Sequence, residues 1–286
     1  MIEPVRSGAE LVAEIESTIP QPGTIAVWWL GQSGYLIRSA GATILIDPYL
    51  SESLTKKYAA TNKPHIRMTR CPVDPSMLTC IDVVLCSHKH SDHMDPGTLP
   101  AIAAASPRCI FVVPASLLEH AASLGLPADR ILGIDHGCVR EFINGSLRIR
   151  ALKAAHENLD TDDQGRHLYL SFVIDAGDIR IFHSGDTMAW PGMAQEIGPG
   201  VDIAFLPING RDPARGVAGN MNAEEAVALA SEFVPLILVP HHYDMFTFNT
   251  VDPGAFVEAS RQLPPTVRPV ILRCGERFET DPRNRT

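Results

Sequence analysis

The spacing of apolar residues predicts a chain in which short strands and helices alternate. Short apolar runs bounded by Gly, Pro, Asn or Asp are typical of strands. Such runs occupy 24–30, 34–38, 42–47, 81–86, 110–113, 147–152, 168–174, 179–183, 201–206, 235–239 and 268–273. Apolar residues at helical spacing occupy 97–105, 115–124, 222–233 and 253–262. This mixture indicates a layered α/β protein.

A further helix is predicted near the start of the chain, within residues 1–20. Ser7 followed by Glu10 has the spacing of an N-terminal capping box. Leu11 and Ile15 would lie on one face of this helix, which could then pack against a sheet.

Residues 51–80 interrupt the alternation, because they are polar and show no apolar period. We therefore expect a long excursion loop there, and loops of this length are often functional, for example as lids over a site. Neither an internal repeat nor a linker divides the sequence. We accordingly expect one domain over residues 1–286.

Composition narrows the classes of protein to which this chain can belong. Hydrophobic residues make up 45% of the 286, so a core can form, and 24 Lys and Arg against 33 Asp and Glu give a net charge of −9. That balance argues against a partner that is a nucleic acid or an anionic membrane. No apolar run approaches the roughly 20 residues that span a bilayer. Without a basic start followed by an apolar stretch, and with six cysteines but no C-x-x-C pair, we expect a cytoplasmic protein with reduced cysteines.

The strongest chemical signal directly follows the predicted strand 81–86. Three histidines and one aspartate fall within six positions, namely His88, His90, Asp92 and His93. Neutral imidazole and carboxylate are ligands that zinc, manganese and iron accept. A chance cluster of this kind in a solvated turn is rare, so we interpret it as a metal site.

Three later strands are also followed by ligand-type residues. They are His156, Asp186 in the sequence Ser-Gly-Asp, and the pair His241 and His242. Open sheets tend to place ligands at the carboxyl ends of their strands. The repetition of this pattern predicts that the side chains converge.

These residues resemble the metal-ligand signature of the metallo-β-lactamase superfamily, and the chain resembles its L-ascorbate-6-phosphate lactonase branch. Further similarity extends over roughly residues 20–280. It is carried by Pro22-Gly23-Thr24, Trp28-Trp29-Leu30-Gly31, Gly41, Asp47, His183-Ser184-Gly185-Asp186, Leu206-Pro207-Ile208-Asn209-Gly210-Arg211, Arg215-Gly216 and Pro240-x-His242. The resemblance implies a four-layer αββα sandwich, with metals at one edge between the two sheets.

The same resemblance implies two divalent metal ions, zinc or manganese, with iron possible. One ion would be held by His88, His90 and His156, the other by Asp92, His93 and His242, and Asp186 would bridge them. His241 is an alternative to His242, which the P-x-H pattern favours.

Two such ions would activate a shared water for attack on an electrophilic carbonyl or phosphorus. Asp92 would orient that water and shuttle a proton, and Tyr243 and Asn209 are candidates, by location, for protonating a leaving group. We therefore expect a metal-dependent hydrolase acting on a lactone or related ester of a small polar or anionic molecule. The alternative is a phosphodiesterase acting on a small phosphodiester. A non-hydrolytic redox protein is disfavoured, because there is no room for a flavodoxin-like module.

Candidate substrate contacts come from loops near the predicted ligands. Arg211 and Arg215, together with Arg166, could clamp a carboxylate or phosphate in a bidentate manner. Ordinary surface arginines are an equal alternative for each. Besides a small-molecule substrate, a second copy of the chain is a possible partner.

Other residues carry weaker expectations. Asp47 follows a strand and would either hydrogen-bond a ligand histidine or cap a turn. His183 would support Asp186 rather than bind metal. Trp28 and Trp29 are expected in the core, since neighbouring residues of a strand face opposite sides.

Overall fold

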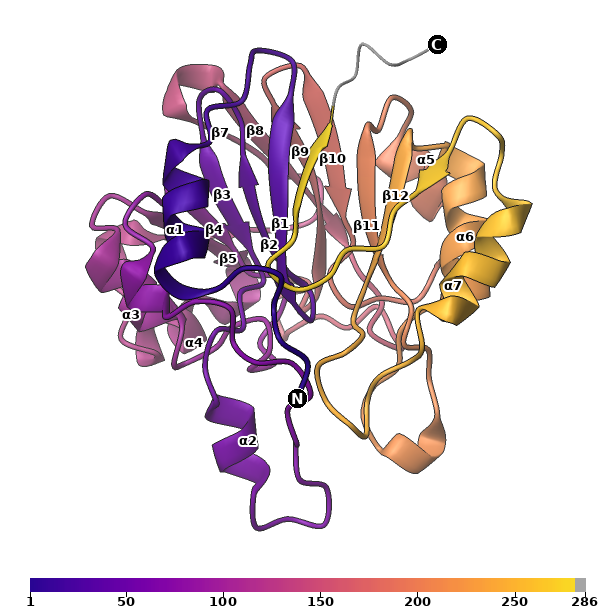
Figure 1. Ribbon diagram of the computed structural model, residues 1–286, viewed down its shortest axis with the longest axis horizontal. Helices are drawn as coiled ribbons and strands as arrows, with labels where there is room; N and C mark the ends of the chain where they lie inside the picture. The colour runs from indigo at the N-terminus through magenta and orange to yellow at the C-terminus, as the bar shows by residue number, and fades with distance from the viewer. Residues whose placement is uncertain (281–286) are drawn as a thin grey trace.

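Two seven-stranded sheets pack face to face between two layers of helices (Figure 1). The computed structural model describes residues 1–280. The four-layer αββα sandwich implied by the sequence resemblance is therefore confirmed.

The first sheet has the strand order β14-β1-β2-β3-β4-β5-β6. Its strands are β1 (Ile25–Gly31), β2 (Gly34–Arg38), β3 (Thr43–Ile46), β4 (Val83–Leu85), β5 (Ile110–Pro114), β6 (Ile131–Ile134) and β14 (Arg277–Thr280). Tight turns join β1, β2 and β3, which pair antiparallel, as such turns require. The longer connections from β3 to β6 allow parallel pairing.

The second sheet has the order β13-β12-β11-β10-β9-β8-β7. Its strands are β7 (Val139–Phe142), β8 (Leu147–Lys153), β9 (Leu170–Ala176), β10 (Ile179–His183), β11 (Ile203–Pro207), β12 (Ile237–His241) and β13 (Arg268–Pro269). The strands from β7 to β10 pair antiparallel, and those from β10 to β13 pair parallel.

The helices form the outer layers. They are α1 (Gly8–Ser17), α2 (Ser53–Tyr58), α3 (Leu99–Ala105), α4 (Leu118–Ser123), α5 (Met193–Ile197), α6 (Ala223–Phe233) and α7 (Gly254–Ala259). Short 3-10 turns occur at Pro75–Met77, Ala115–Leu117, Ala128–Arg130, Ile143–Gly145, Pro213–Arg215 and Ser260–Gln262. Helices α1, α3 and α4 cover the first sheet, and α5, α6 and α7 cover the second, whereas α2 protrudes below the sheets in Figure 1.

Strand alternation in β1 sends its side chains into two different cores. Val27 and Trp29 belong to the cluster between the sheets, whereas Trp28 packs outward with Leu11 of α1. The Trp28 indole Nε1 donates to Oε2 of Glu14, 2.9 Å away, so the outward tryptophan keeps a partner. Both tryptophans are buried, as predicted.

Two local predictions are corrected. The segment 51–80 is not wholly a loop, because it contains α2 and a 3-10 turn. At the start of α1 the predicted capping box does not form, since the Ser7 side chain makes no capping hydrogen bond and Glu10 pairs with Arg6 instead.

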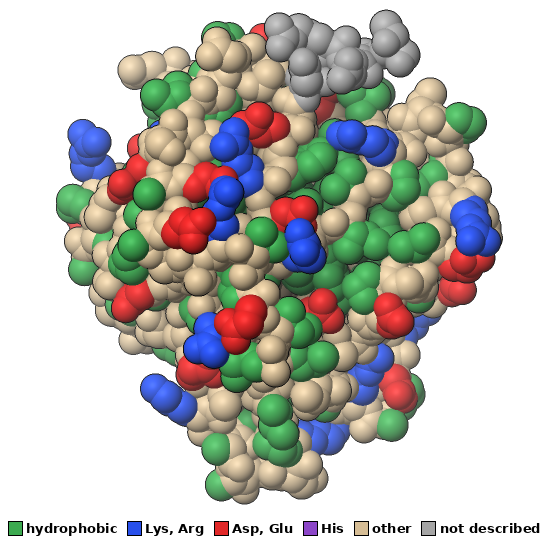
Figure 2. All heavy atoms as spheres, viewed as in Figure 1, with side chains coloured by type: hydrophobic (Ala, Val, Ile, Leu, Met, Phe, Trp, Pro, Cys, Tyr) green, Lys and Arg blue, Asp and Glu red, His purple; other side chains and the backbone are tan. Residues whose placement is uncertain are grey.

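Positive and negative side chains are mixed on the face of the molecule that Figure 2 draws. Figure 2 shows acidic and basic side chains interspersed over one face, without a large patch of one sign. Within residues 1–280, no helix is both long and apolar enough to cross a membrane.

Candidate metal centre

Seven ligand-type side chains converge from four connections at one edge of the sandwich. The loop after β4 supplies His88, His90, Asp92 and His93, while His156, Asp186 and His242 follow β8, β10 and β12. They fall into three groups whose ligand atoms lie within 4.8 Å of one another in each group: His88, His90 and His156; His88, His93 and Asp186; and Asp92, His93 and His242.

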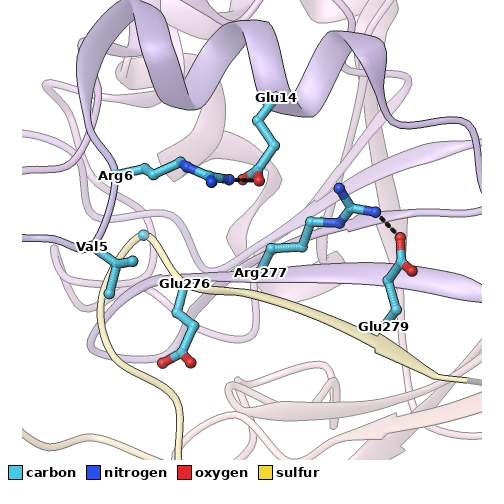
Figure 3. A pocket seen from close by; sticks show the side chains of 7 residues that line it. Val5, Arg6, Glu14, Glu276, Arg277 and Glu279 are labelled. Atoms are coloured by element: carbon cyan, nitrogen blue, oxygen red, sulfur yellow. Dashed lines mark hydrogen bonds and ion pairs between the residues drawn. The ribbon is translucent and has the colours of Figure 1, made fainter.

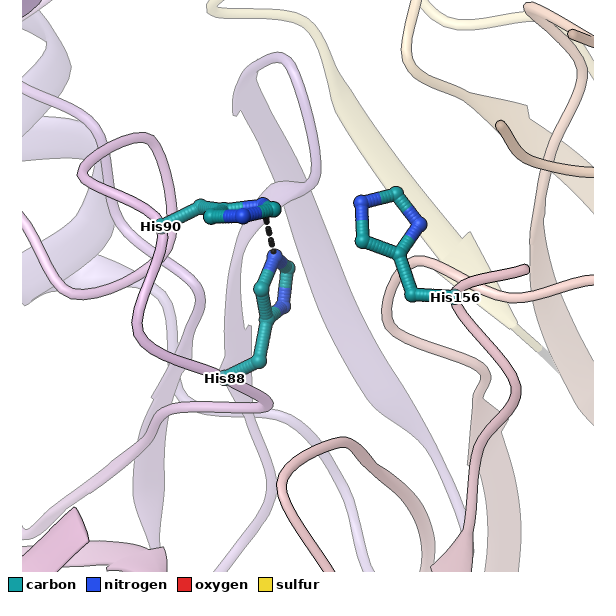
Figure 4. Close-up of side chains that lie close together, drawn as sticks. All are labelled: His88, His90 and His156. Carbon is teal, nitrogen blue, oxygen red and sulfur yellow. Dashed lines mark hydrogen bonds between the residues drawn. The ribbon is translucent and has the colours of Figure 1, made fainter. Parts of the chain in front are cut away.

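The first group consists of three imidazoles that face one another (Figure 4). His88 Nε2 lies 2.9 Å from Nδ1 of His90. His156 approaches from the opposite loop, and its Nδ1 lies 3.0 Å from the carbonyl oxygen of Gly219. That contact leaves Nε2 of His156 free to act as a ligand.

Asp186, a member of the second group, lies between the first group and the third. Its Oδ1 lies 3.4 Å from Nε2 of His93, and its Oδ2 lies 3.1 Å from Nε2 of His242. The same Oδ2 is 4.0 Å from Nε2 of His156. One carboxylate therefore spans both sets of ligand residues.

The donor set fits divalent metal ions. Nε2 of His93 is buried without a hydrogen-bond partner among the described residues, although Asp92 and Asp186 lie within 4 Å of it. A buried polar atom without a partner is costly unless a further ligand satisfies it. Imidazole and carboxylate together suit zinc, manganese or iron.

The protonation states of His88, His90 and Asp186 favour metal ligation. Burial lowers the pKa of His90 to about 4, and burial with the neighbouring histidines holds the pKa of His88 well below its ordinary value. Burial disfavours charge on Asp186, yet His242 and His93 hold the pKa of its carboxyl well below the usual range. These three groups are therefore in the forms that bind metal. Burial disfavours charge on His93, yet Asp186, Asp47 and Asp92 outweigh burial and raise the pKa of His93 well above its ordinary value, so metal binding would displace a proton from His93.

Gln32 is a site residue that sequence reasoning treated only as part of a turn. Its side chain is buried, and Nε2 donates to Oδ2 of Asp92 across 2.8 Å. Gln32, Asp47 and His242 all have left-handed backbones, with φ of 53°, 43° and 67°. Such strain in residues other than glycine clusters at functional sites. The Gly-Gln-Ser-Gly turn between two apolar strands was the available signal.

Gly185 allows the loop after β10 to approach the loop after β4. Its φ is 58°, and a Cβ there would lie 2.7 Å from Cβ of Ser87 and 2.8 Å from the carbonyl oxygen of Leu170. Only glycine fits this approach, which sets Asp186 beside the histidines.

A cavity of about 420 Å³ opens onto the metal ligands. His90, Asp92, His156, Asp186 and His242 contribute to its lining. Further parts of the wall come from α2 and the loop that follows it, from the ligand loop after β4, from His120, and from residues near 217 and 248. The segment 51–80 therefore lies beside the site.

The structure does not bring the expected proton donors to this cavity. Tyr243 is buried against Trp29, with ring centroids 4.3 Å apart, and its hydroxyl donates to the carbonyl oxygen of Leu272. Asn209 does not line the cavity, and its Nδ2 donates to Oδ1 of the lining residue Asn249 across 3.0 Å. Neither position supports the role expected from the sequence.

The expected arginine clamp is also directed elsewhere. Arg211 makes a bidentate ion pair with Glu225, at 2.6 and 2.7 Å. Arg215 donates to the carbonyl oxygen of Asn209, and Arg166 pairs with Asp162. None of the three arginines lines the cavity; its basic residues are Lys57 and Lys89, which sequence reasoning missed.

His183 and His241, which the sequence pattern did not favour as ligands, lie outside the three groups of ligand residues. The rings of His183 and His241 stack at 5.1 Å, and His241 Nδ1 lies 3.0 Å from the Ser33 hydroxyl. His183 accepts from the amide of Gly185, so it holds the backbone next to Asp186 rather than the carboxylate itself.

A second hollow, of about 410 Å³, shares no lining residue with this cavity. It lies between the N-terminal segment and β14 (Figure 3). Its charges are paired, Arg6 with Glu14, Arg277 with Glu279 and Glu276 with the neighbouring Arg273, and it contains neither histidine nor cysteine. It therefore lacks the chemistry of the first site.

Comparisons with known proteins agree with this geometry. The chain is 25% identical over 280 residues to "Probable L-ascorbate-6-phosphate lactonase UlaG" of Salmonella heidelberg (strain SL476). The alignment covers 86% of this chain and 77% of that protein. The fold is similar to isothiocyanate hydrolase from Delia radicum gut bacteria, with a TM-score of 0.68, 20% identity and coverage of 88% and 98%. It is also similar to Igni18, a metallo hydrolase from Ignicoccus hospitalis, with a TM-score of 0.65, 20% identity and coverage of 90% and 99%.

The family assignment rests on a longer stretch than the motifs alone. Residues 42–243 match the family described as "Beta-lactamase superfamily domain", and this range includes all seven ligand-type residues. The chain therefore belongs to the beta-lactamase superfamily of metal-dependent hydrolases.

Proposed function

We propose that this protein hydrolyses a lactone or related ester in a small polar or anionic molecule. The observation that carries the proposal is the position of Asp186 between two sets of ligands that open onto one cavity. The named lactonase relatives, at 25% identity, support the substrate class.

His88, His90 and His156 would hold one divalent ion, and Asp92, His93 and His242 the other, with Asp186 shared between them. Bound there, zinc, manganese or iron would lower the pKa of a shared water toward ~7 and polarise the substrate oxygen. Serine or cysteine nucleophiles are then not required.

Asp92 is the residue best placed to handle the proton. Its Oδ2 accepts a hydrogen bond from Gln32 and lies 3.8 Å from Nε2 of His93, and the residue lines the cavity. Its carboxylate would orient the attacking water and accept a proton from it. The alcohol that leaves would need a proton, and Asp92 could return the same one.

The test joins elemental analysis of the purified protein with a panel of lactones, phosphodiesters and amides. We expect close to two metal ions per chain and turnover of lactones. Replacement of His88 with Ala should lower both the metal content and the rate, whereas His120→Ala should spare the metal content, because His120 lines the cavity outside the ligand groups. Turnover of phosphodiesters alone would overturn the proposal in favour of a phosphodiesterase.

A further inference from the structure

An aromatic wall stands within the cavity that holds the metal ligands. We define it as Tyr58, His65, Phe246 and Phe248. The rings of Tyr58 and His65 stack with centroids 4.1 Å apart and an interplanar angle of 19°. Phe246 and Phe248 meet His65 edge to face, at 5.1 and 4.5 Å.

The wall is fixed in place rather than loosely packed. Nδ1 of His65 lies 3.1 Å from the carbonyl oxygen of Lys63, and Phe246 is 1% exposed against Tyr49, with ring centroids 5.7 Å apart. Tyr58 and Phe248 are only half-buried and line the cavity. Rigid aromatic faces of this kind bind flat apolar groups, because stacking adds to the burial of area.

Two lysines line the same cavity. Lys57 comes from α2 and Lys89 from the ligand loop. Within residues 1–280, neither makes an ion pair, although the expected arginines Arg211 and Arg166 are paired. Lys57 Nζ lies 5.1 Å from the centroid of the Tyr58 ring, so one cation sits against the wall.

Their charge reaches other groups of the cavity. The pKa of His120 is lowered first by burial and then by Lys89. The pKa of His65 is lowered by burial, which outweighs the opposing effects of the Lys63 carbonyl and of Asp92, and Lys57 adds a smaller lowering. In a chain of net charge −9, two lysines without an ion-pair partner beside the metal-ligand residues offer a local site for an anion.

We propose that the cavity selects a substrate that carries an anionic group and a flat apolar face, bound by Lys57 and Lys89 and by the aromatic wall. This inference rests on the proposed function and deepens it by naming the substrate class. The anion would contact the ammonium groups while the ring lies on the wall, which leaves the ester directed toward Asp92. The segment 51–80 thereby becomes a recognition element.

The test uses two dyes that share one ring system. 1-Anilinonaphthalene-8-sulfonate is anionic, and N-phenyl-1-naphthylamine is the same molecule without the sulfonate. Fluorescence titration gives the Kd of each dye for the wild type, for a Lys57→Gln, Lys89→Gln double variant, and for Lys56→Gln. Lys56 is the matched control, because it is an exposed lysine of the same helix that does not line the cavity.

We expect the double variant to raise the Kd of the sulfonate dye by roughly tenfold and to leave that of the neutral dye within about twofold. Lys56→Gln should change neither Kd, and Phe248→Ala should raise both. An unchanged Kd for the sulfonate dye, equal changes for both dyes, or no saturable binding to the wild type would overturn the inference. Dye binding does not depend on hydrolysis, so an inactive protein with the expected dye pattern would refute only the proposed reaction.

Discussion

Nδ1 of His93 lies 2.7 Å from Oδ2 of Asp47, and both side chains are fully buried. The Ser87 amide and hydroxyl donate to the same carboxylate, at 2.7 and 2.6 Å. Of the two roles expected for Asp47, the structure shows the contact to a ligand histidine. This contact sets the tautomer of His93 and turns Nε2 toward Asp92 and Asp186.

Replacement of Asp47 with Ala should therefore weaken metal binding by roughly 10- to 100-fold, the range typical of such outer partners. A chelator competition titration would measure the change. Asp82→Ala is the control, since Asp82 accepts from the Thr43 amide at the other end of β3 and lies outside the ligand groups. Equal metal affinities in the two variants would contradict the role of Asp47.

Gln32 should act as a positioning residue for Asp92. Gln32→Asn keeps an amide and a side chain that tolerates a left-handed backbone, but it is too short to reach Asp92. We expect it to lower kcat by roughly tenfold, to shift the pH profile of kcat, and to release metal more readily. Gln21→Asn, at an exposed site, should behave as the wild type. Full activity with an unshifted pH profile in Gln32→Asn would show that its contact with Asp92 is dispensable.

Metal removal should destabilise the fold, because the bound ions stabilise only the folded state. With free metal at ~100 times its Kd, one site contributes about 2.7 kcal/mol to the free energy of unfolding. Thermal unfolding with and without a chelator would measure the loss, and added zinc or manganese should reverse it. A His88→Ala, His93→Ala double variant should show little response to chelator, and a response as large as that of the wild type would place the stabilising metal elsewhere.

Arg211→Ala should affect stability rather than substrate binding. Its partner Glu225 also caps α6, accepting from the Asn222 amide at 3.0 Å. Loss of a partly exposed ion pair is worth about 0.2–1 kcal/mol, measurable by denaturant titration. The KM for an anionic ester should stay unchanged, and a raised KM would return Arg211 to the site.

Local sequence determined the elements whose signals lie close together in the chain. The alternation of strands and helices, the apolar run of β1 and the residue types of the ligand loop all follow from short-range pattern. The Asn222 and Glu225 capping box at the start of α6 is of the same kind. By contrast, Ser7 and Glu10 have a similar spacing but form no capping box, and Glu10 pairs with Arg6.

Tertiary structure decided which polar groups meet. Short strands such as β7 and β14 have no strong apolar run and exist because a neighbouring strand offers hydrogen bonds. Likewise, Arg211 forms an ion pair with Glu225 instead of lining the cavity. Lys57 lines the cavity because α2 protrudes beside that cavity. Which residues can bind a metal depends on their side-chain chemistry and can be recognised in the sequence. Which side chains form hydrogen bonds and ion pairs with one another depends on distances between remote segments, which only the packing of the two sheets establishes.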